Sequence, residues 1–398
     1  MRSATPESAG PNLLHDTVVR SYYFLFYAIL GSFMPFVSLF FERTLHFSGT
    51  EIGSISSVRQ LLAVLAPPLW GILSDRLRMP RLLIAVGLAG SGGALLLFNE
   101  VRLFWPMMLL MTFFSFFHSP MAPLIDSITL GYSARTKARF GRVRAWGSLG
   151  FVFVGVCLWM VVRGDAGLGL GFWSAAVCAF LALTLVPLLP AVEAPSRGHV
   201  SRRAFAVFRQ RDVFVLAFCA LMGSFAMTSY YAFFSNYLHH VGLDAKWMAP
   251  IWALGPVSEM PFVFYADDIV RRVGIRRVFA MGLAAIAVRL FVLSLQPPTA
   301  IIVLSQCLHA FTFGAVTVGG LIYINSRAPA DLRASAQSIY GADLGLGGVA
   351  GCVAAGWLVD GLDLWRMMAV NAGIAAAGLV VFLVFFRAHV EEGAERRA

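Results

Sequence analysis

A single acidic residue, Glu259, lies near the middle of an apolar segment that is long enough to be embedded in a membrane. The segment runs from residue 249 to residue 265, and the nearest charges along the chain are Lys246 and Asp267. An ionised side chain at that depth is costly, and it usually faces a cavity or a partner. Apolar surroundings favour the neutral form of a carboxyl group, so such a residue can bind and release a proton. We therefore expect Glu259 to couple transport to protons.

Two further polar residues lie in the apolar segments that follow. Arg289 is flanked on both sides by almost purely apolar sequence, and a lone cation there would be very costly. We expect it to pair with Glu259 or to bind the carboxylate of a substrate. His309 either joins this network as a proton-coupling residue or bonds only to a backbone carbonyl. The alternative for Glu259 and Arg289 is a structural ion pair that never titrates.

A second set of residues is less clearly placed by hydropathy. Asp126 and Arg144 fall near the ends of their apolar segments, which by itself suggests a surface pair. Asp343 lies in a glycine-rich run and is either a second proton site or part of helix packing. Tyr27 and Tyr230 belong to aromatic clusters at 22–27 and 230–237. Their rings would stack on an aromatic substrate or face lipid.

Composition places the chain in the class of integral membrane proteins. Hydrophobic residues make up 59% of the sequence and charged residues 13%, whereas soluble domains contain about 25% charged residues. The net charge of +10 could suggest nucleic-acid binding. We reject nucleic acid as a partner, because the basic residues lie in short loops between apolar runs.

The sequence shows no pattern that favours an enzyme, a cofactor or a metal. The five cysteines all lie in apolar runs without paired spacing, so we expect neither disulfides nor metal ligation. Motifs of the HExxH, GxSxG and Walker types are missing. We therefore expect no catalytic residues and no cofactor.

Apolar stretches predict twelve membrane-spanning helices, each about long enough to cross a bilayer. The predicted spans are 20–41, 52–73, 82–98, 103–130, 145–163, 168–189, 213–239, 247–266, 278–296, 300–324, 335–359 and 366–386. The terminal segments and alternate loops hold most of the 31 Lys and Arg residues. This asymmetry predicts that both termini are cytoplasmic in a multi-pass protein of the cell inner membrane. We expect the protein to be a monomer in the lipid bilayer.

The longest connector divides the chain into two parts. It is basic, runs from residue 191 to residue 211, and follows the sixth predicted span. We predict a six-helix bundle at 1–190, a cytoplasmic linker at 191–211 and a second six-helix bundle at 212–398. Two such halves with a site at the bilayer midplane form a recurrent plan of transporters.

The loop after the second span resembles the signature between helices 2 and 3 of the major facilitator superfamily. The residues that carry the resemblance are Gly71, Asp75 and Arg76, within the run GILSDRLRMPR at 71–81. Gly71 would allow close helix approach, Asp75 can cap a helix end, and Arg76 can pin a cytoplasmic gate. The alternative is an ordinary basic loop. The resemblance implies the all-α fold of that superfamily, with twelve transmembrane helices in two six-helix halves.

Longer stretches resemble the phenylpropionate permease branch of the superfamily and, more distantly, the oligosaccharide and nucleoside proton symporters. The stretches are SPMAPLID (119–126), FGRVRAWGS (140–148), LGPVSE (254–259), AVRLF (287–291) and LHAFTFG (308–314). The resemblance implies that Asp126 and Arg144 contact the substrate. It also matches the symporters' helix 8 acid, helix 9 arginine and helix 10 histidine to Glu259, Arg289 and His309.

The sequence departs from the oligosaccharide symporters in helix 10. Gln306 and Thr312 stand where those symporters carry a lysine and a glutamate, so we expect the proton to be carried elsewhere. Thr312 matches the phenylpropionate branch better. We therefore predict a secondary transporter that imports a small aromatic or other organic acid with a proton. The alternatives are a sugar or nucleoside symporter, an exporter of hydrophobic compounds, and a scaffold or sensor that does not transport.

Overall fold

The computed structural model describes residues 13–136, 140–191 and 201–387, and these ranges are helical apart from short connections. Eleven helical segments among them are long and apolar enough to cross a membrane. The place of the predicted eighth span is taken by α9 (Met248–Phe264), whose 17 residues are at the lower limit for crossing a bilayer. The prediction of an all-α membrane protein is confirmed.

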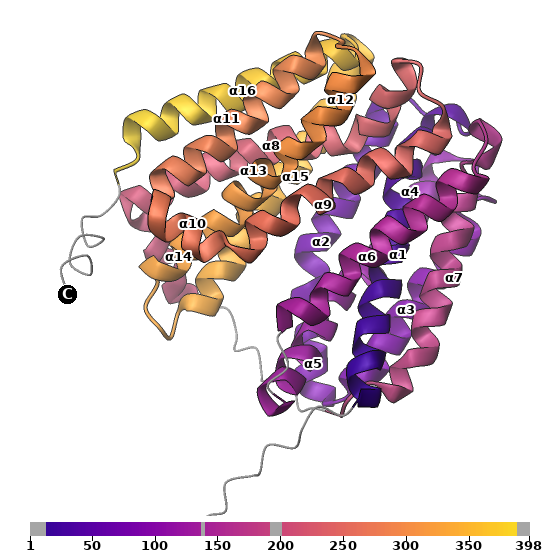
Figure 1. Ribbon diagram of the computed structural model, residues 1–398, viewed down its shortest axis with the longest axis horizontal. Helices are drawn as coiled ribbons and strands as arrows, with labels where there is room; N and C mark the ends of the chain where they lie inside the picture. The colour runs from indigo at the N-terminus through magenta and orange to yellow at the C-terminus, as the bar shows by residue number, and fades with distance from the viewer. Residues whose placement is uncertain (1–12, 137–139, 192–200, 388–398) are drawn as a thin grey trace, which may run out of the picture. The chain divides into compact units, whose positions relative to one another are not determined.

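The chain divides into two compact units, which are described separately. Unit 1 contains Met1–Phe40, Leu62–Arg197 and Asp244–Ala253. Its helices, with the parts of α1 and α2 that lie in unit 2 included, are α1 (Leu13–Arg43), α2 (Gly49–Leu77), α3 (Pro80–Leu97), α4 (Phe104–His118), α5 (Met121–Thr136), α6 (Phe140–Val161), η1 (Asp165–Gly167), α7 (Leu170–Leu185) and η2 (Val186–Leu188). Within this unit α3 packs against both α4 and α7, and Figure 1 shows α3 and α7 side by side.

The predicted fourth span is broken between α4 and α5. The break falls at Ser119 and Pro120, where proline cannot donate a backbone hydrogen bond within a helix. The Ser119 hydroxyl donates to the carbonyl of Ser115 at 2.7 Å and lies 3.1 Å from that of Leu62. A side chain therefore supplies the hydrogen bond that a backbone carbonyl at the break needs in the bilayer interior. The next helix, α5, begins at Met121 and carries Asp126 on its second turn.

Unit 2 contains Phe41–Leu61, Gly198–Leu243 and Leu254–Ala398. Its helices, including the first turns of α9 that lie in unit 1, are η3 (Arg202–Arg209), α8 (Arg211–His240), α9, α10 (Ala266–Val273), α11 (Ile275–Ser294), α12 (Thr299–Ser305), η5 (Gln306–Leu308), α13 (His309–Phe313), η6 (Gly314–Gly319), α14 (Gly320–Arg327), α15 (Arg333–Gly361) and α16 (Leu364–Phe385). Here α8 packs against α15 and α16, and α11 packs along α16, as Figure 1 shows.

Small residues bring α8 and α15 into close contact. A Cβ atom on Gly347 would lie 2.5 Å from a backbone carbonyl oxygen of α8, so only glycine fits there. Hydroxyl groups also join the two helices, because Ser224 donates to the carbonyl of Leu344 at 2.6 Å and Ser229 to that of Gly351 at 2.8 Å. Close backbone approach and interhelical hydrogen bonds are the usual means of helix association in membranes.

Two short segments belong to a different unit from the residues that flank them in the sequence. Phe41–Leu61 belongs to unit 2, and Asp244–Ala253 belongs to unit 1. In unit 2, the carboxylate of Asp360 accepts hydrogen bonds from the backbone N–H groups of Gly49 and Thr50, both at 2.7 Å. It therefore caps the first turn of α2, where these groups have no partner within the helix. In unit 1, the rings of Trp159 and Trp247 lie 5.8 Å apart, with Trp247 in the turn η4 (Ala245–Trp247).

The predicted division into bundles at 1–190 and 212–398 stays a prediction. Of the predicted linker at 191–211, residues 192–200 lie outside the described part of the chain.

The predicted tenth span, at 300–324, is interrupted twice. A 3₁₀ turn, η5, covers Gln306–Leu308, and a π-helical segment, η6, covers Gly314–Gly319. Such irregular turns within a helix are frequent at functional sites. The five-residue helix α13 between them begins at His309. The interruptions therefore flank the histidine that the sequence singled out.

Candidate functional site

In unit 1, three helices bring together an acid, an arginine and a tyrosine. The Asp126 carboxylate on α5 lies 3.1 Å from Nη1 of Arg144 on α6. It also accepts a hydrogen bond of 2.6 Å from the hydroxyl of Tyr23 on α1. The Asp126 side chain is 24% exposed and the Arg144 side chain 43% exposed. The pair is thus partly accessible, and the Asp126 carboxylate contacts only Nη1 of the guanidinium group.

An aromatic ring lies against the same arginine. The guanidinium carbon of Arg144 is 5.5 Å from the centre of the Tyr27 ring, a distance at which a cation is attracted to the ring face. Tyr27 has room there because α6 carries Gly147, where a Cβ atom would lie 2.5 Å from the ring. The Tyr23 and Tyr27 rings are stacked, with centres 6.5 Å apart. Unit 1 therefore offers a partly exposed arginine beside an aromatic ring.

In unit 2, Arg289 on α11 is buried, with 1% of its surface exposed. Its Nη2 donates to the hydroxyl of Tyr230 at 2.7 Å and to the side-chain carbonyl of Gln306 at 2.5 Å. The guanidinium carbon lies 4.6 Å from the centre of the Tyr230 ring. Nε and Nη1 of Arg289 have no hydrogen-bond partner among the described residues. This cation is therefore held by neutral groups.

Glu259 on α9 contacts His309 instead of Arg289. Its carboxylate lies 3.4 Å from Nε2 of His309, and Nδ1 of the same ring lies 2.9 Å from the hydroxyl of Tyr231. Tyr231 also interacts electrostatically with both Arg289 and Glu259. The structure therefore differs from the predicted direct pair of Glu259 and Arg289. A tyrosine and a histidine stand between the acid and the arginine, in the order Arg289, Tyr231, His309, Glu259; we call these four residues the relay.

A cavity of about 270 Å³ adjoins the relay within unit 2. Its lining includes Tyr231. The remaining polar lining residues are uncharged and carry hydroxyl or amide groups: Gln60, Ser224, Thr228, Thr312 and Thr317. The other lining side chains are apolar. Arg289 and Tyr230 are not among the lining residues, because Tyr230 is fully buried. Their predicted contact with substrate stays a prediction.

The remaining predicted residues lie apart from these clusters. Oδ2 of Asp343 on α15 is buried without a hydrogen-bond partner among the described residues, and the role of Asp343 as a second proton site stays a prediction. Asp75 and Arg76 are exposed on the last turn of α2. A Cβ atom on Gly71 would meet no described atom within 4 Å, so this structure shows no close helix approach there. Within the described residues, no group of side chains could hold a metal ion.

Two tyrosines of these clusters, Tyr23 and Tyr231, were not singled out from the sequence. Tyr23 contacts Asp126, and Tyr231 contacts His309, whereas the sequence drew attention to Tyr27, four residues further along α1, and to Tyr230, which directly precedes Tyr231. Adjacent residues of a helix point about 100° apart. The only available signal was the aromatic clusters themselves, which do not show which face of α1 or α8 meets a charged group.

The helical architecture, together with charged groups held inside apolar segments, defines a secondary transporter of the major facilitator superfamily. The MFS_1 like family matches residues 17–368, and the chain belongs to this family of the superfamily. Its relatives are transporters and not enzymes, which agrees with the prediction from the sequence.

Relatives with several different names cover nearly the whole chain. The maltose permease of Geobacillus stearothermophilus is 27% identical over 92% of this chain and 93% of its own length. The "Probable 3-phenylpropionic acid transporter" of Escherichia coli is 26% identical over 80% of this chain and 84% of its own length. The crystal structure of the nucleoside transporter NupG superposes with a TM-score of 0.84 at 20% identity, covering 95% of this chain and all of NupG. The predicted superfamily is thereby confirmed.

The two charged clusters should respond differently to paired substitutions. Asp126→Ala and Arg144→Ala each remove the same ion pair, so their effects on stability should be non-additive by about 1 kcal/mol. Glu259→Ala and Arg289→Ala should be closer to additive, because Arg289 donates to neutral groups. Thermal unfolding of the single and double variants in detergent measures both couplings. Additivity at the first pair, or a larger coupling at the second, would contradict this arrangement.

Proposed function

We propose that this protein is a proton-coupled symporter of the cell inner membrane that imports a small organic acid, with an aromatic acid as the favoured substrate. The proposal rests on the contacts and the exposure of Arg144. Only its Nη1 contacts Asp126, its side chain is 43% exposed, and the Tyr27 ring lies beside it. The rest of the guanidinium offers planar donors of the kind that bind a carboxylate in two-point fashion.

The charges of the pair suggest how a carboxylate would bind. A substrate carboxylate at Arg144 competes with the Asp126 carboxylate for the same cation, because both carry negative charge. A proton that binds to an acid of the protein at the same time offsets the added negative charge. A carboxylate that enters with one proton adds no net charge to the membrane-embedded part of the protein. This balance avoids an unpaired charge in an apolar environment, which would cost several kcal/mol.

We assign the proton to the relay of unit 2, at Glu259 and His309. Their contact is 3.4 Å between Oε2 and Nε2, and the two side chains are 20% and 12% exposed. An imidazole between a carboxylate and a tyrosine hydroxyl can accept or donate at either nitrogen. We further propose that both termini are cytoplasmic and that the protein acts as a monomer.

A sugar or nucleoside is the second candidate substrate. The cavity of about 270 Å³ in unit 2 is lined by hydroxyl and amide groups without a charged side chain, which suits a neutral solute rich in hydroxyl groups. The names of the relatives, a maltose permease and a nucleoside transporter, support the same candidate. In that case Asp126 would accept hydrogen bonds from the solute, and its loss would be more harmful than for an acid.

Loss of the titratable group at Glu259 should uncouple transport from protons. Glu259→Gln keeps the shape of the side chain but cannot be ionised, so it should abolish uphill uptake driven by a pH gradient while leaving exchange of substrate across the membrane. The measurement is uptake of a radiolabelled aromatic acid into proteoliposomes with and without a pH gradient. Glu100→Gln, at an exposed position in the loop between α3 and α4, is the matched control. Unchanged uphill uptake by the Glu259 variant would refute the assignment.

Substitution of Arg144 should separate the two substrate classes. Arg144→Lys loses the planar fork, so affinity for an aromatic acid should fall about tenfold or more. Arg142→Lys, which changes an exposed arginine two residues earlier on the same helix, should have little effect. The measurement is the affinity of purified protein for the acid, its methyl ester, a nucleoside and a disaccharide. Tight binding of a nucleoside or disaccharide that depends on Asp126, with no binding of the acid, would establish the second candidate instead.

A further inference from the structure

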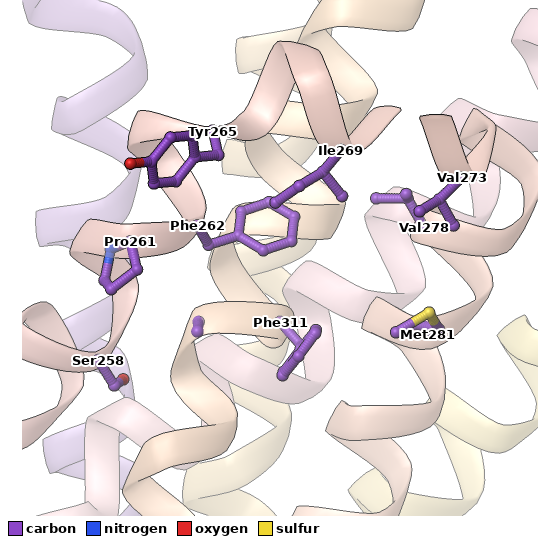
Figure 2. Close-up of a pocket in the computed structure, with 10 residues that line it drawn as sticks. Ser258, Pro261, Phe262, Tyr265, Ile269, Val273, Val278, Met281 and Phe311 are labelled. Carbon is purple, nitrogen blue, oxygen red and sulfur yellow. The ribbon is translucent and has the colours of Figure 1, made fainter. Parts of the chain in front are cut away.

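An apolar groove lies between four helices of unit 2. It has a volume of about 390 Å³. Its walls come from α9, α10, α11 and α13, and Figure 2 shows the ring of Phe262 at its centre with Ile269 of α10 reaching toward it. The groove runs along α9 from Ser258 to Tyr265, a length of about 10 Å on a helix. Its shape is therefore that of a channel along the helices, open over part of its length.

The wall on α11 belongs to a face that is directed at lipid. Met281 lines the groove, and Val288 and Leu295 follow it at intervals of seven residues, which places all three on one side of the helix. They are 48%, 55% and 64% exposed. Large apolar side chains that are exposed in a row along a membrane helix face hydrocarbon chains. The groove therefore opens where acyl chains are available.

The groove offers nothing that would orient a polar solute. The Ser258 hydroxyl donates to the backbone carbonyl of Gly255 at 2.8 Å and lies 3.2 Å from that of Gln306, so its donor is already used. Phe262 and Phe311 pack edge to face, with ring centres 6.0 Å apart. A hydrocarbon chain packed against these rings leaves no polar group without a hydrogen-bond partner. The chemistry of the lining thus favours a hydrocarbon chain as the occupant.

Basic side chains stand at one end of the groove. Arg272 directly precedes Val273, and Arg277 directly precedes Val278, and both valines line the groove. Both arginines are exposed and form no ion pair with another described side chain. The neighbouring arginines are engaged elsewhere, because Arg271 pairs with Asp268 and Arg276 donates to a carbonyl of α16. Among the described residues, Arg272 and Arg277 are therefore two exposed cations without an ion-pair partner, next in sequence to lining residues of an apolar groove.

We propose that this groove is a binding site for one anionic phospholipid. One acyl chain lies in the groove along α9, and the phosphate of the headgroup lies against Arg272 and Arg277. The basic loop between the eighth and ninth predicted spans is cytoplasmic by the distribution of charge, and basic sites at that surface bind anionic headgroups. The groove shares no lining residue with the cavity of about 270 Å³ that adjoins the relay.

Lipid retention by the purified full-length protein tests this site. The protein in detergent is mixed with equal amounts of phosphatidylglycerol and phosphatidylcholine that carry the same acyl chains, and bound lipids are counted by native mass spectrometry. We expect one phosphatidylglycerol to be retained in clear preference to phosphatidylcholine. Arg272→Gln combined with Arg277→Gln should weaken this lipid about tenfold or more, since each basic residue near a membrane surface contributes a factor of about five.

The groove and the charges are tested separately by matched variants. Val273→Trp fills the rim of the groove and should reduce retention, whereas Val288→Trp, on the same lipid-facing side of α11, should not. Arg202→Gln combined with Arg209→Gln removes the same charge from η3 and is the control for non-specific attraction. Thermal unfolding confirms that each variant is folded. Equal retention of the two lipids, loss in the control variants, or full competition by glycerol 1-phosphate without acyl chains would overturn the proposal.

Discussion

The cost of holding a charge among apolar helices is the constraint on which the rest of this structure depends. Arg289 is almost completely buried, and a guanidinium group in such surroundings must be compensated within the protein. The neighbouring groups compensate the charge of Arg289 only in part. Tyr230 and Gln306 accept hydrogen bonds from one nitrogen, and Glu259 stands two side chains away, beyond Tyr231 and His309. Under the proposed function, the net charge around the arginine changes when the relay takes up a proton.

The backbone is shaped around these groups. The tenth predicted span is interrupted by a 3₁₀ turn at Gln306 and by a π-helical segment that begins at Gly314, so residues near His309 depart from the regular helical spacing. In unit 1, the break at Pro120 starts a new helix that carries Asp126, and Gly147 leaves space for the Tyr27 ring beside Arg144. In both units, departures from regular helix accompany the polar groups inside the apolar segments.

Much of the fold was predictable from hydropathy, because a membrane segment must be helical and about twenty residues long to satisfy its backbone. Helix interruptions were harder to foresee, since η6 contains no proline. Hydropathy suggested that Asp126 and Arg144 form a surface pair, and the resemblance to known symporters implied that they contact the substrate; the structure shows the pair, and the substrate contact stays a prediction. Two partners were expected for Arg289, either Glu259 or a substrate carboxylate, and formal charge does not reveal that Gln306 and Tyr230 accept hydrogen bonds from its Nη2. Whether Tyr230 or Tyr231 contacts His309 depends on how α8 is rotated about its axis. A helix that is apolar on all sides has no hydrophobic pattern that predicts this rotation.

Proton movement that accompanies substrate entry tests the central claim most directly. Purified protein is reconstituted in liposomes without a pH gradient, an aromatic acid is added outside at a pH where it is fully ionised, and the external pH is followed in weak buffer. A proton-coupled symporter that uses the relay should make the external solution more alkaline as substrate enters, and Glu259→Gln should abolish this change. Entry of the substrate without any change in external pH would contradict the account.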